Sequence, residues 1–314
     1  MSIWEKLSKP IYCLAPMEDV TDTVFRQLLC DLGKPALMFS EFTNIRSLYS
    51  HSQDQRRLEY TDQEKPLILQ IWGMEPELYY NAADLAFELG YDGVDINMGC
   101  PQKKIVKKGA CSALINDQVL AGEIIQATIE GARGRLPVSV KTRIGYGKVV
   151  TQEWASFLLT FKIAALTIHG RTSAQMSAVP ANWEEIGKVV KLRDSLESKT
   201  LILGNGDILT LSQAEAMVKT HKVDGVMIGR GIFQDPWLFN QNHPPVDHAE
   251  KLRTLKKHVE LWEQVWNREN DFNRLKRFFK IYCNGFEGAS ELRARLMSTT
   301  TATQVYEIID TYLL

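Results

Sequence analysis

The chain contains 314 residues, of which 45% are hydrophobic and 24% are charged, and it carries a formal net charge of −1. These values are typical of an ordinary globular protein, and the length suffices for one large domain and one small domain. A net charge near zero excludes a general attraction to nucleic acid or membranes, so any site for a polyanion must be a local patch. The sequence contains neither a run of the roughly 18 apolar residues that a membrane helix needs nor a signal peptide at its start, so we expect no membrane association.

The five cysteines form no disulfide or metal-binding pattern. Their number is odd, no two are spaced as Cys-x-x-Cys, and the spacings match neither a zinc site nor an iron–sulfur cluster. A His-Glu-x-x-His motif, a Walker loop and a serine nucleophile elbow are also missing from the sequence. We therefore expect reduced thiols, a cytoplasmic location and no bound metal.

From residue 11 to about residue 239, short runs rich in β-branched residues alternate with longer amphipathic stretches. Eight strands, each followed by a crossover segment, predict an α/β fold of the (β/α)8 TIM-barrel type. An open doubly wound sheet is the alternative, but it would normally carry a Gly-x-Gly-x-x-Gly turn after an early strand, and the sequence has none. The expected strands cover residues 11–15, 37–40, 67–71, 93–97, 138–141, 165–169, 200–203 and 225–228. The expected helices cover residues 22–32, 76–89, 118–131, 152–161, 183–196 and 212–220.

The pattern changes after the polar, proline-bearing segment 241–247. From residue 249 onward only helical periodicity is found, which predicts a small C-terminal helical domain. Its expected helices cover residues 252–267, 271–283, 289–298 and 303–313. We therefore expect a catalytic barrel domain over residues 1–243 and a helical domain over residues 244–314.

Functional groups of such a barrel lie at the C-terminal ends of its strands. A polar or charged residue stands at nearly every predicted strand end, and one such residue alone would be weak evidence. Lys141 could stabilise negative charge on a ring system, and the amide of Gln70 could hydrogen-bond the edge of a heterocycle. A lone histidine such as His169 is often only a structural residue.

The ends of the last two strands favour a phosphate site. Segments 204–207 and 228–231 offer glycine backbone N–H groups and the cation of Arg230, followed by the start of a short helix. The alternative is a pair of ordinary turns.

Cys100 stands just past the fourth predicted strand, between Gly99 and Pro101. These neighbours place it on a stiff, sharply turned loop, which favours a reactive thiol facing a cavity. The alternative is a small apolar packing residue. Cys111, in the small-residue run 109–113, is interpreted as such a packing residue.

Together these motifs resemble the flavin-dependent tRNA-dihydrouridine synthases, and the resemblance spans almost the whole chain. The loop Asp95-Ile-Asn-Met-Gly-Cys-Pro101 is similar to the active-site loop of that family, and Leu14-Ala-Pro-Met17 is similar to its first-strand signature. The chain departs from the family between residues 175 and 183, where the family usually carries a tyrosine and a glycine. The other similar segments are 20–22 with Arg26, 109–115, 140–145, 169–172, 204–208, 227–231 and 282–290.

The resemblance implies a barrel that binds FMN and reduces the C5=C6 bond of specific uridines in tRNA to 5,6-dihydrouridine, with NADPH or NADH as the electron donor. Reduced FMN would give a hydride to C6 and Cys100 a proton to C5, since a thiol is still protonated at neutral pH yet acidic enough to donate. The uracil must leave its stack to reach the thiol. The residues expected to hold FMN are Pro16, Met17, Glu18, Gln70, Lys141, His169, Asn205, Gly206, Asp207, Gly229 and Arg230.

The charge distribution is consistent with an RNA substrate. Residues 251–280 hold nine basic and four acidic residues, and four lysines follow Cys100 between residues 103 and 108. Basic segments beside an active-site mouth suit contacts to a phosphate backbone, although a solvated helix face could also carry them. We expect a monomer. The residues expected to contact tRNA are Asn97, Lys103, Arg143, Arg171, Arg274 and Arg277.

Two other functions fit parts of the pattern. A flavin barrel enzyme acting on a small molecule would share the barrel and the phosphate loops, but it would have no use for the helical tail. An RNA-binding protein without catalysis would be expected to lack Cys100 or Lys141, and both residues are present.

Overall fold

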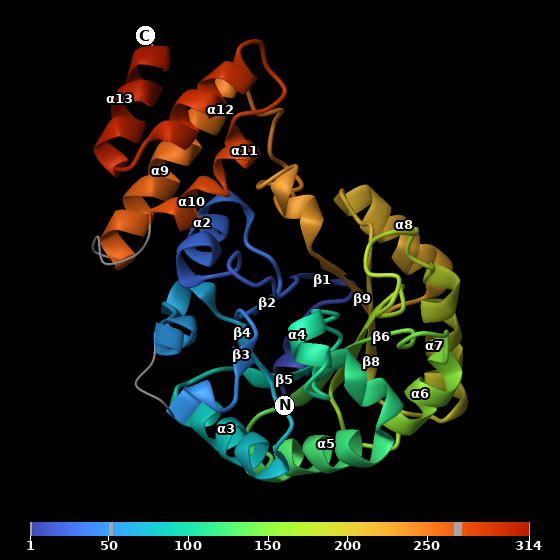
Figure 1. Ribbon diagram of the computed structural model, residues 1–314. Coiled ribbons are helices and arrows are strands. Elements are labelled where there is room, and N and C mark those ends of the chain that lie inside the picture. Colours follow the sequence, from blue (N-terminus) through green and yellow to red (C-terminus); the bar gives the residue numbers. More distant parts are fainter. Residues whose placement is uncertain (1, 50–52, 267–271, 314) are drawn as a thin grey trace.

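The computed structural model describes residues 2–49, 53–266 and 272–313 (Figure 1). Within these ranges, parallel strands follow the order β1-β9-β8-β7-β6-β5-β4-β2, and β3 pairs with the end of β4. A parallel bridge between Cys13 and Leu37 joins the first two strands and closes the sheet on itself. The predicted TIM barrel is therefore confirmed. The strands are β1 (Ile11–Leu14), β2 (Met38–Phe39), β3 (Thr43–Asn44), β4 (Leu67–Trp72), β5 (Gly93–Met98), β6 (Val138–Arg143), β7 (Ala165–His169), β8 (Leu201–Asn205) and β9 (Gly225–Ile228).

Helices surround the barrel, as Figure 1 shows. Side chains cap several helix N-termini: Asp22, for example, accepts a hydrogen bond from the N–H of Phe25 at 2.9 Å. Pro76 opens α3 in its first turn, and Gly90, with a φ of 79°, follows its end. The α-helices of the barrel region are α1 (Ile3–Lys6), α2 (Thr23–Gly33), α3 (Pro76–Glu88), α4 (Lys103–Val106), α5 (Gln118–Ala132), α6 (Thr151–Leu158), α7 (Trp183–Ser195) and α8 (Leu211–His221). Short 3-10 helices are η1 (Ser47–Tyr49), η2 (Gln53–Leu58), η3 (Asp62–Glu64), η4 (Cys111–Asn116) and η5 (Arg230–Phe233).

The barrel interior is filled by apolar side chains from facing strands. Leu37, Phe39 and Ile68 are fully buried there with Leu203 and Met227. Buried strands of a parallel sheet carry apolar residues on both faces, which is why these segments were recognisable as short continuous runs. The strands thus form a rigid scaffold whose C-terminal ends carry the loops described below.

The C-terminal region is helical, as expected. Its helices are α9 (His248–Trp266), α10 (Asn273–Lys276), α11 (Phe279–Tyr282), α12 (Ala289–Ser298) and α13 (Ala302–Leu313). The single helix expected over residues 271–283 is instead divided into α10 and α11, and residues 267 and 271 lie outside the described residues.

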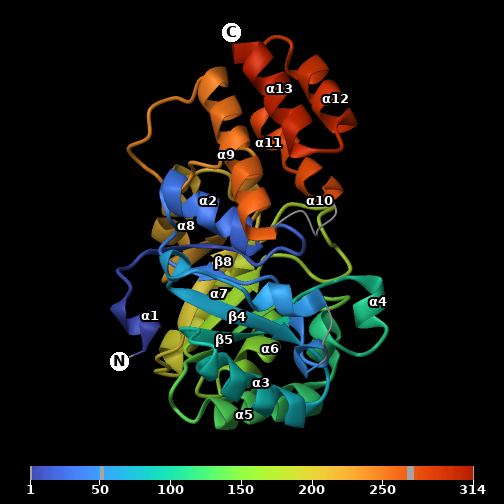
Figure 2. The same cartoon turned by 90° about the vertical axis from the view of Figure 1, so that its left-hand side faces the viewer.

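Figures 1 and 2 show α9–α11 beside α2 of the barrel. The ring of Phe25 on α2 lies 5.0 Å from that of Phe278 and 5.7 Å from that of His258. Apolar residues of both regions belong to one continuous cluster. The helical region therefore shares its core with the barrel. The division at residue 243 stays a proposal.

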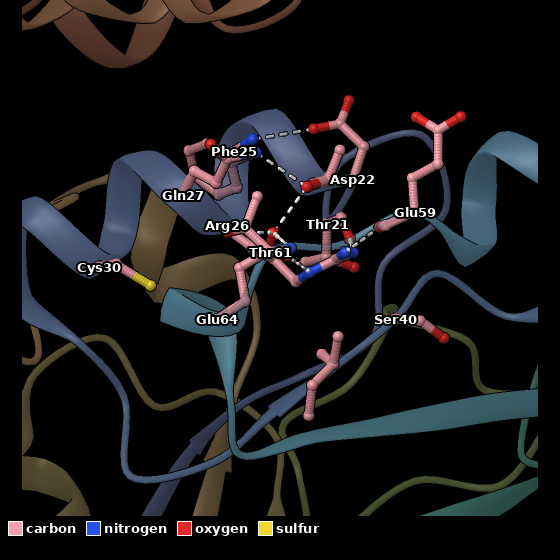
Figure 3. A network of polar contacts seen from close by, with 12 residues as sticks. Thr21, Asp22, Phe25, Arg26, Gln27, Cys30, Ser40, Glu59, Thr61 and Glu64 are labelled. Carbon is pink, nitrogen blue, oxygen red and sulfur yellow. Dashed lines mark hydrogen bonds and ion pairs between the residues drawn. The ribbon is translucent and has the colours of Figure 1, made fainter. Parts of the chain in front are cut away.

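A buried ion pair fixes α2 in this position (Figure 3). Arg26 contacts Glu64 at 2.6 Å, and both side chains are almost fully buried. Glu64 also accepts hydrogen bonds from Thr23 and from the N–H of Thr61, while Arg26 donates to the carbonyl of Glu59. A buried charge pair is tolerated when its hydrogen bonds are satisfied in this way. The similarity noted at Arg26 is thus explained by structure: the residue ties α2 to segment 59–64.

Candidate active site

A cavity of about 490 Å³ opens at the C-terminal ends of the strands. Its volume lies within the range of roughly 300–1,000 Å³ that is usual for ligand pockets. It is lined by nine of the residues that were expected to hold a cofactor, namely Pro16, Met17, Lys141, His169, Asn205, Gly206, Asp207, Gly229 and Arg230. Side chains far apart in the sequence therefore meet at one end of the barrel, as their positions at strand ends predicted.

Lys141 lines this cavity from β6, two residues before the strand ends. Its Nζ donates to the side-chain oxygen of Asn205 at 3.2 Å, and Asn205 in turn donates to the carbonyl of Met227 at 2.8 Å. Burial lowers the pKa of Lys141 to about 8, with a further contribution from the positive charge of Arg143. The lysine is still mostly protonated at neutral pH and supplies a positive charge to the cavity.

Asp207 organises the opposite end of the cavity. It accepts hydrogen bonds from Arg230 at 2.9 Å, from the N–H of Ala181 at 2.8 Å, and from Arg171. Gly206 has a φ of 130°, and a Cβ there would lie only 2.7 Å from that of Ala181, so the close approach requires glycine. The glycine-rich turns and Arg230, with η5 beginning at that residue, lie together at this cavity, and their binding of a phosphate stays a prediction.

His169 lies between these two ends and is uncharged. Burial lowers its pKa to about 2, and the cations Lys141, Arg143 and Arg171 act in the same direction. A neutral imidazole offers one donor and one acceptor to a ligand. It holds no readily released proton at neutral pH.

The Cys100 loop is anchored by a relay of buried polar side chains. The amide oxygen of Asn97 accepts the N–H groups of Gly99 and Cys100 at 3.0 Å, and its nitrogen donates to Gln70. Gln70 donates to Asp95 at 2.6 Å, and Ser139 donates to the other oxygen of that carboxyl. Gln70 is fully buried beneath the loop and away from the cavity lining, so its contact with a cofactor stays a prediction.

Cys100 itself is half-buried. A hydrogen bond donated by Cys111 lowers its pKa to about 7; burial opposes this shift, and a backbone N–H and the Arg143 charge assist it. Arg143 also holds the loop directly, because its Nε donates to the carbonyl of Gly99 at 2.6 Å. At neutral pH part of the Cys100 thiol is therefore ionised, and part still carries a proton that it can donate.

The remaining predicted residues lie around the mouth. Glu18 forms an ion pair with Arg57 at 2.6 Å and lies outside the cavity lining. Arg277 donates to the carbonyl of Asp19 at 2.8 Å, and the exposed Arg274 lines a smaller cavity of about 90 Å³ where the barrel meets the helical region. Lys103 is exposed on α4.

The basic tail is partly neutralised within the protein. Lys256 pairs with Asp310 at 2.8 Å, and Lys257 pairs with Asp31 of α2 at 2.6 Å. Lys251 keeps its charge but donates hydrogen bonds to the neutral Asn284. Arg268 lies outside the described residues. The excess of positive charge counted from the sequence therefore overstates what this region presents to a partner. By contrast, all four lysines that follow Cys100 are exposed.

Sequence reasoning missed three residues of the Cys100 site: Asp95, Cys111 and Ser112. Asp95 could have been recognised from the sequence, because a carboxylate inside an apolar strand indicates a buried polar contact. Cys111 and Ser112 belong to the small-residue run 109–113 and to the segment 109–115 that is similar to the family, but the sequence did not show that they lie beside Cys100, because this proximity depends on the folded path of the loop.

Two absences hold for the described residues. Nowhere in ranges 2–49, 53–266 and 272–313 do three or more His, Cys, Asp or Glu side chains gather as a metal site. Within the same ranges, the structure has no helix of the length and apolarity needed to span a membrane.

The fold and the site define a TIM-barrel protein with a ligand cavity at the C-terminal ends of its strands. Solved structures share this fold. Morphinone reductase aligns with a TM-score of 0.56 at 14% identity over 77% of this chain and 87% of its own. Histamine dehydrogenase from Rhizobium sp. 4-9 aligns with a TM-score of 0.57 at 11% identity, over 80% of this chain and 48% of its own.

Sequence comparisons give the family. The family model described as Dihydrouridine synthase (Dus) matches residues 13–313. The probable tRNA-dihydrouridine synthase 2 of Bacillus subtilis is 42% identical over 99% of this chain and 96% of its own length. A probable tRNA-dihydrouridine synthase of Staphylococcus epidermidis is 41% identical with the same coverage. The chain belongs to the dihydrouridine synthase family, which confirms the family and enzyme class predicted from the sequence.

Proposed function

We propose that the protein reduces the C5=C6 bond of uridines in tRNA to 5,6-dihydrouridine, with FMN as its cofactor and NADPH or NADH as the electron donor. The observation that carries the proposal is the placement of Cys100. Its half-buried thiol stands on the loop after β5, where Asn97 accepts the backbone N–H of this residue and Arg143 holds Gly99. A Cys100 thiolate also raises the pKa of Lys141, which lines the large cavity. In a member of this family, that combination provides a proton donor beside a cationic cofactor site.

The residues present fit FMN. The phosphate would be held by Arg230 and the backbone N–H groups near Gly206 and Gly229, since neither turn carries a side chain that would block close approach. Lys141 and the neutral His169 would face the ring system, where a positive charge favours an anionic ring. When bound, FMN supplies the hydride that uracil receives at C6.

The proton at C5 comes from Cys100. A general acid works best when its pKa lies near the working pH, because a sufficient fraction is protonated and the proton is still readily released. Asn97 and Arg143 hold the Cys100 loop through Gly99 and so direct the thiol. With its pKa lowered to about 2, His169 is a poor candidate for this proton.

The RNA would approach from the side of α4 and the helical region. Exposed Lys103 and its neighbours on α4 offer phosphate contacts next to the Cys100 loop, and Arg274 extends the positive surface across the junction. Arg277 and Arg171 hold Asp19 and Asp207 in the free protein, so they would act by shaping loops as well as by contact. On this basis, residues 244–314 form the tRNA-binding part of a monomer.

The experiment compares substrates. The purified protein, loaded with FMN, is given NADPH together with either an unmodified tRNA transcript or free uridine, and dihydrouridine is measured by mass spectrometry. Product from tRNA and none from free uridine is the expected result. Turnover of free uridine at an equal rate would favour a small-molecule enzyme. A protein that cannot be reconstituted with FMN would overturn the proposal altogether.

A further inference from the structure

A second thiol lies beside Cys100. Cys111 is the first residue of η4, and the N–H of the next residue, Ser112, reaches the carbonyl of Cys100 at 3.4 Å. A hydrogen bond from the Cys111 thiol also contributes to the lowered pKa of Cys100. Cys111 is fully buried and belongs to a small apolar cluster with Phe42 and Ile105, against which Cys100 packs. Cys100 and Cys111 therefore lie at the edge of one apolar cluster, and Cys100 is the more exposed of the two.

The backbone around Cys111 is fixed to the Cys100 loop. The hydroxyl of Ser112 donates to the carbonyl of Cys100 at 2.9 Å and lies 2.7 Å from the hydroxyl of Ser173 on a neighbouring loop. Cys111 has a φ of 56°, in the left-handed region that few residues with a side chain adopt. Such a conformation persists when its surroundings over-determine it, and it often marks a functional site.

Charged and titratable groups approach this pair from three sides. Glu18 follows β1, Arg143 and Lys141 belong to β6, and Cys111 belongs to η4. Arg143 favours the Cys100 thiolate and Glu18 opposes it, while the hydrogen bond from Cys111 is the largest of these influences. Tyr79 is the further titratable group that faces Cys111. Burial raises the pKa of Cys111 well above its ordinary value, so it stays protonated and can act only as a donor.

We propose that Cys111 is a positioning residue for the proton transfer made by Cys100. This inference rests on the function proposed above. As the S–H bond of Cys100 breaks and a C–H bond forms at uracil C5, the electron pair stays on the Cys100 sulfur. Cys111 keeps its own proton and stabilises that new thiolate through a hydrogen bond, which strengthens because its acceptor has become charged.

The test compares Cys111→Ala with Cys111→Ser in the full-length, FMN-loaded protein. Both substitutions keep a Cβ, so the strain of the left-handed backbone stays the same, but only serine keeps a donor. The measurement is the pH dependence of Cys100 alkylation by iodoacetamide, followed peptide by peptide by mass spectrometry. In the unmodified chain the midpoint is expected near pH 7. In Cys111→Ala it should move toward the ordinary thiol value of about 8.5, and in Cys111→Ser it should return part of the way.

The matched control is Cys283→Ala, which removes another buried thiol in the helical region and should leave the midpoint unchanged. With tRNA as substrate, the falling limb of the pH–rate profile should shift upward in Cys111→Ala together with the alkylation midpoint. An unchanged midpoint in Cys111→Ala would overturn the proposal and leave Cys111 a packing residue, even if the variant is less stable. Because alkylation requires no tRNA, this result is separable from failure of the proposed function, which would show as no dihydrouridine from the unmodified chain.

Discussion

At the scale of single residues, two cations of the large cavity differ in their surroundings. Lys141 belongs to β6 and bonds to Asn205, whereas Arg230 lies after β9 and bonds to Asp207. They differ in exposure: the side chain of Arg230 is 62% exposed, whereas Lys141 is part-buried. Arg230 is therefore free to exchange its contact with Asp207 for a ligand phosphate.

Replacement of Arg230 by alanine should weaken FMN binding. A charge-assisted hydrogen bond contributes about 1.5–3 kcal/mol, which corresponds to a Kd higher by roughly 10- to 150-fold. The Kd is measured by titrating apoprotein with FMN and following the quenching of flavin fluorescence. Arg253→Ala, which removes an exposed arginine on α9, is the control. Equal affinity in the two variants would show that Arg230 is not at the phosphate.

Most cavity residues were predictable because strand ends of a parallel barrel converge at one end. Pro16, Lys141 and Asn205 needed only the positions of their strands. Gln70 was expected at the ligand by the same rule. It lies fully buried with its amide bonded to Asp95 and Asn97, and its contact with a cofactor stays a prediction. The direction of a side chain at a strand end depends on the partners it finds in neighbouring strands, and a single sequence does not show them.

At the scale of elements, the segment between β5 and α5 does most to shape the site. It carries Cys100, then the exposed lysines of α4, then Cys111 in η4. The thiol and a basic surface therefore belong to one stretch of chain. An RNA bound along α4 would place its target nucleotide next to the thiol.

Replacing Lys103, Lys104 and Lys107 together by alanine should weaken tRNA binding and reduce its salt dependence. Each lost phosphate contact lowers the slope of log K against log salt by about 0.7–0.9, so a decrease of roughly 2 is expected. Binding is measured by filter retention between about 50 and 200 mM salt. The matched control replaces Lys191, Lys199 and Lys219, which are exposed elsewhere on the barrel. An equal decrease in both triple variants would contradict a specific role for α4.

The barrel strands and the long helices with a clear period were predicted within a few residues, whereas β3, α4 and η4 were not predicted. β3, α4 and η4 each cover six residues or fewer, too few for a period to emerge. The expected helix over residues 271–283 divides into α10 and α11, where Phe278 turns inward against Phe25. Tertiary packing therefore explains the break between α10 and α11, and the local sequence does not predict it.

At the scale of the whole molecule, the barrel and the helical region depend on each other through α2. Arg26 and Glu64 fix one side of this helix, and Phe25 on the other side packs against His258 and Phe278. Removing the helical region would expose this apolar surface. Substitutions of exposed basic residues are therefore better tests of tRNA binding than removal of the helical region.

His258 should make the junction sensitive to acid. It is fully buried and bonded to Tyr282, and burial lowers its pKa to about 3. Unfolding raises that pKa to about 6.5, so the unfolded chain binds the proton first and stability is lost as pH falls from 6.5 toward 3. Between pH 7 and pH 5, this single group should cost about 2 kcal/mol.

The measurement is urea unfolding of the unmodified chain and of His258→Gln at both pH values. The glutamine variant is expected to be less stable at pH 7 but to lose about 2 kcal/mol less on acidification. Other titrating groups are common to both proteins and cancel in the comparison. An equal acid loss would show that His258 is not held neutral by the fold.

The most direct test of Cys100 as the proton donor is single-turnover reduction of tRNA by the pre-reduced, FMN-loaded protein. The unmodified chain is compared with Cys100→Ala. NADPH should bleach the flavin of both proteins at similar rates, because Cys100 is absent from the cavity lining formed by the described residues. Formation of dihydrouridine should then be slower in Cys100→Ala by about 10²–10⁴-fold, the usual contribution of a positioned general acid. Cys100→Ser should behave like the alanine variant, since a hydroxyl is a far weaker acid. Dihydrouridine formed by Cys100→Ala at the unmodified rate, with chemistry limiting, would contradict the assignment of Cys100 as the proton donor.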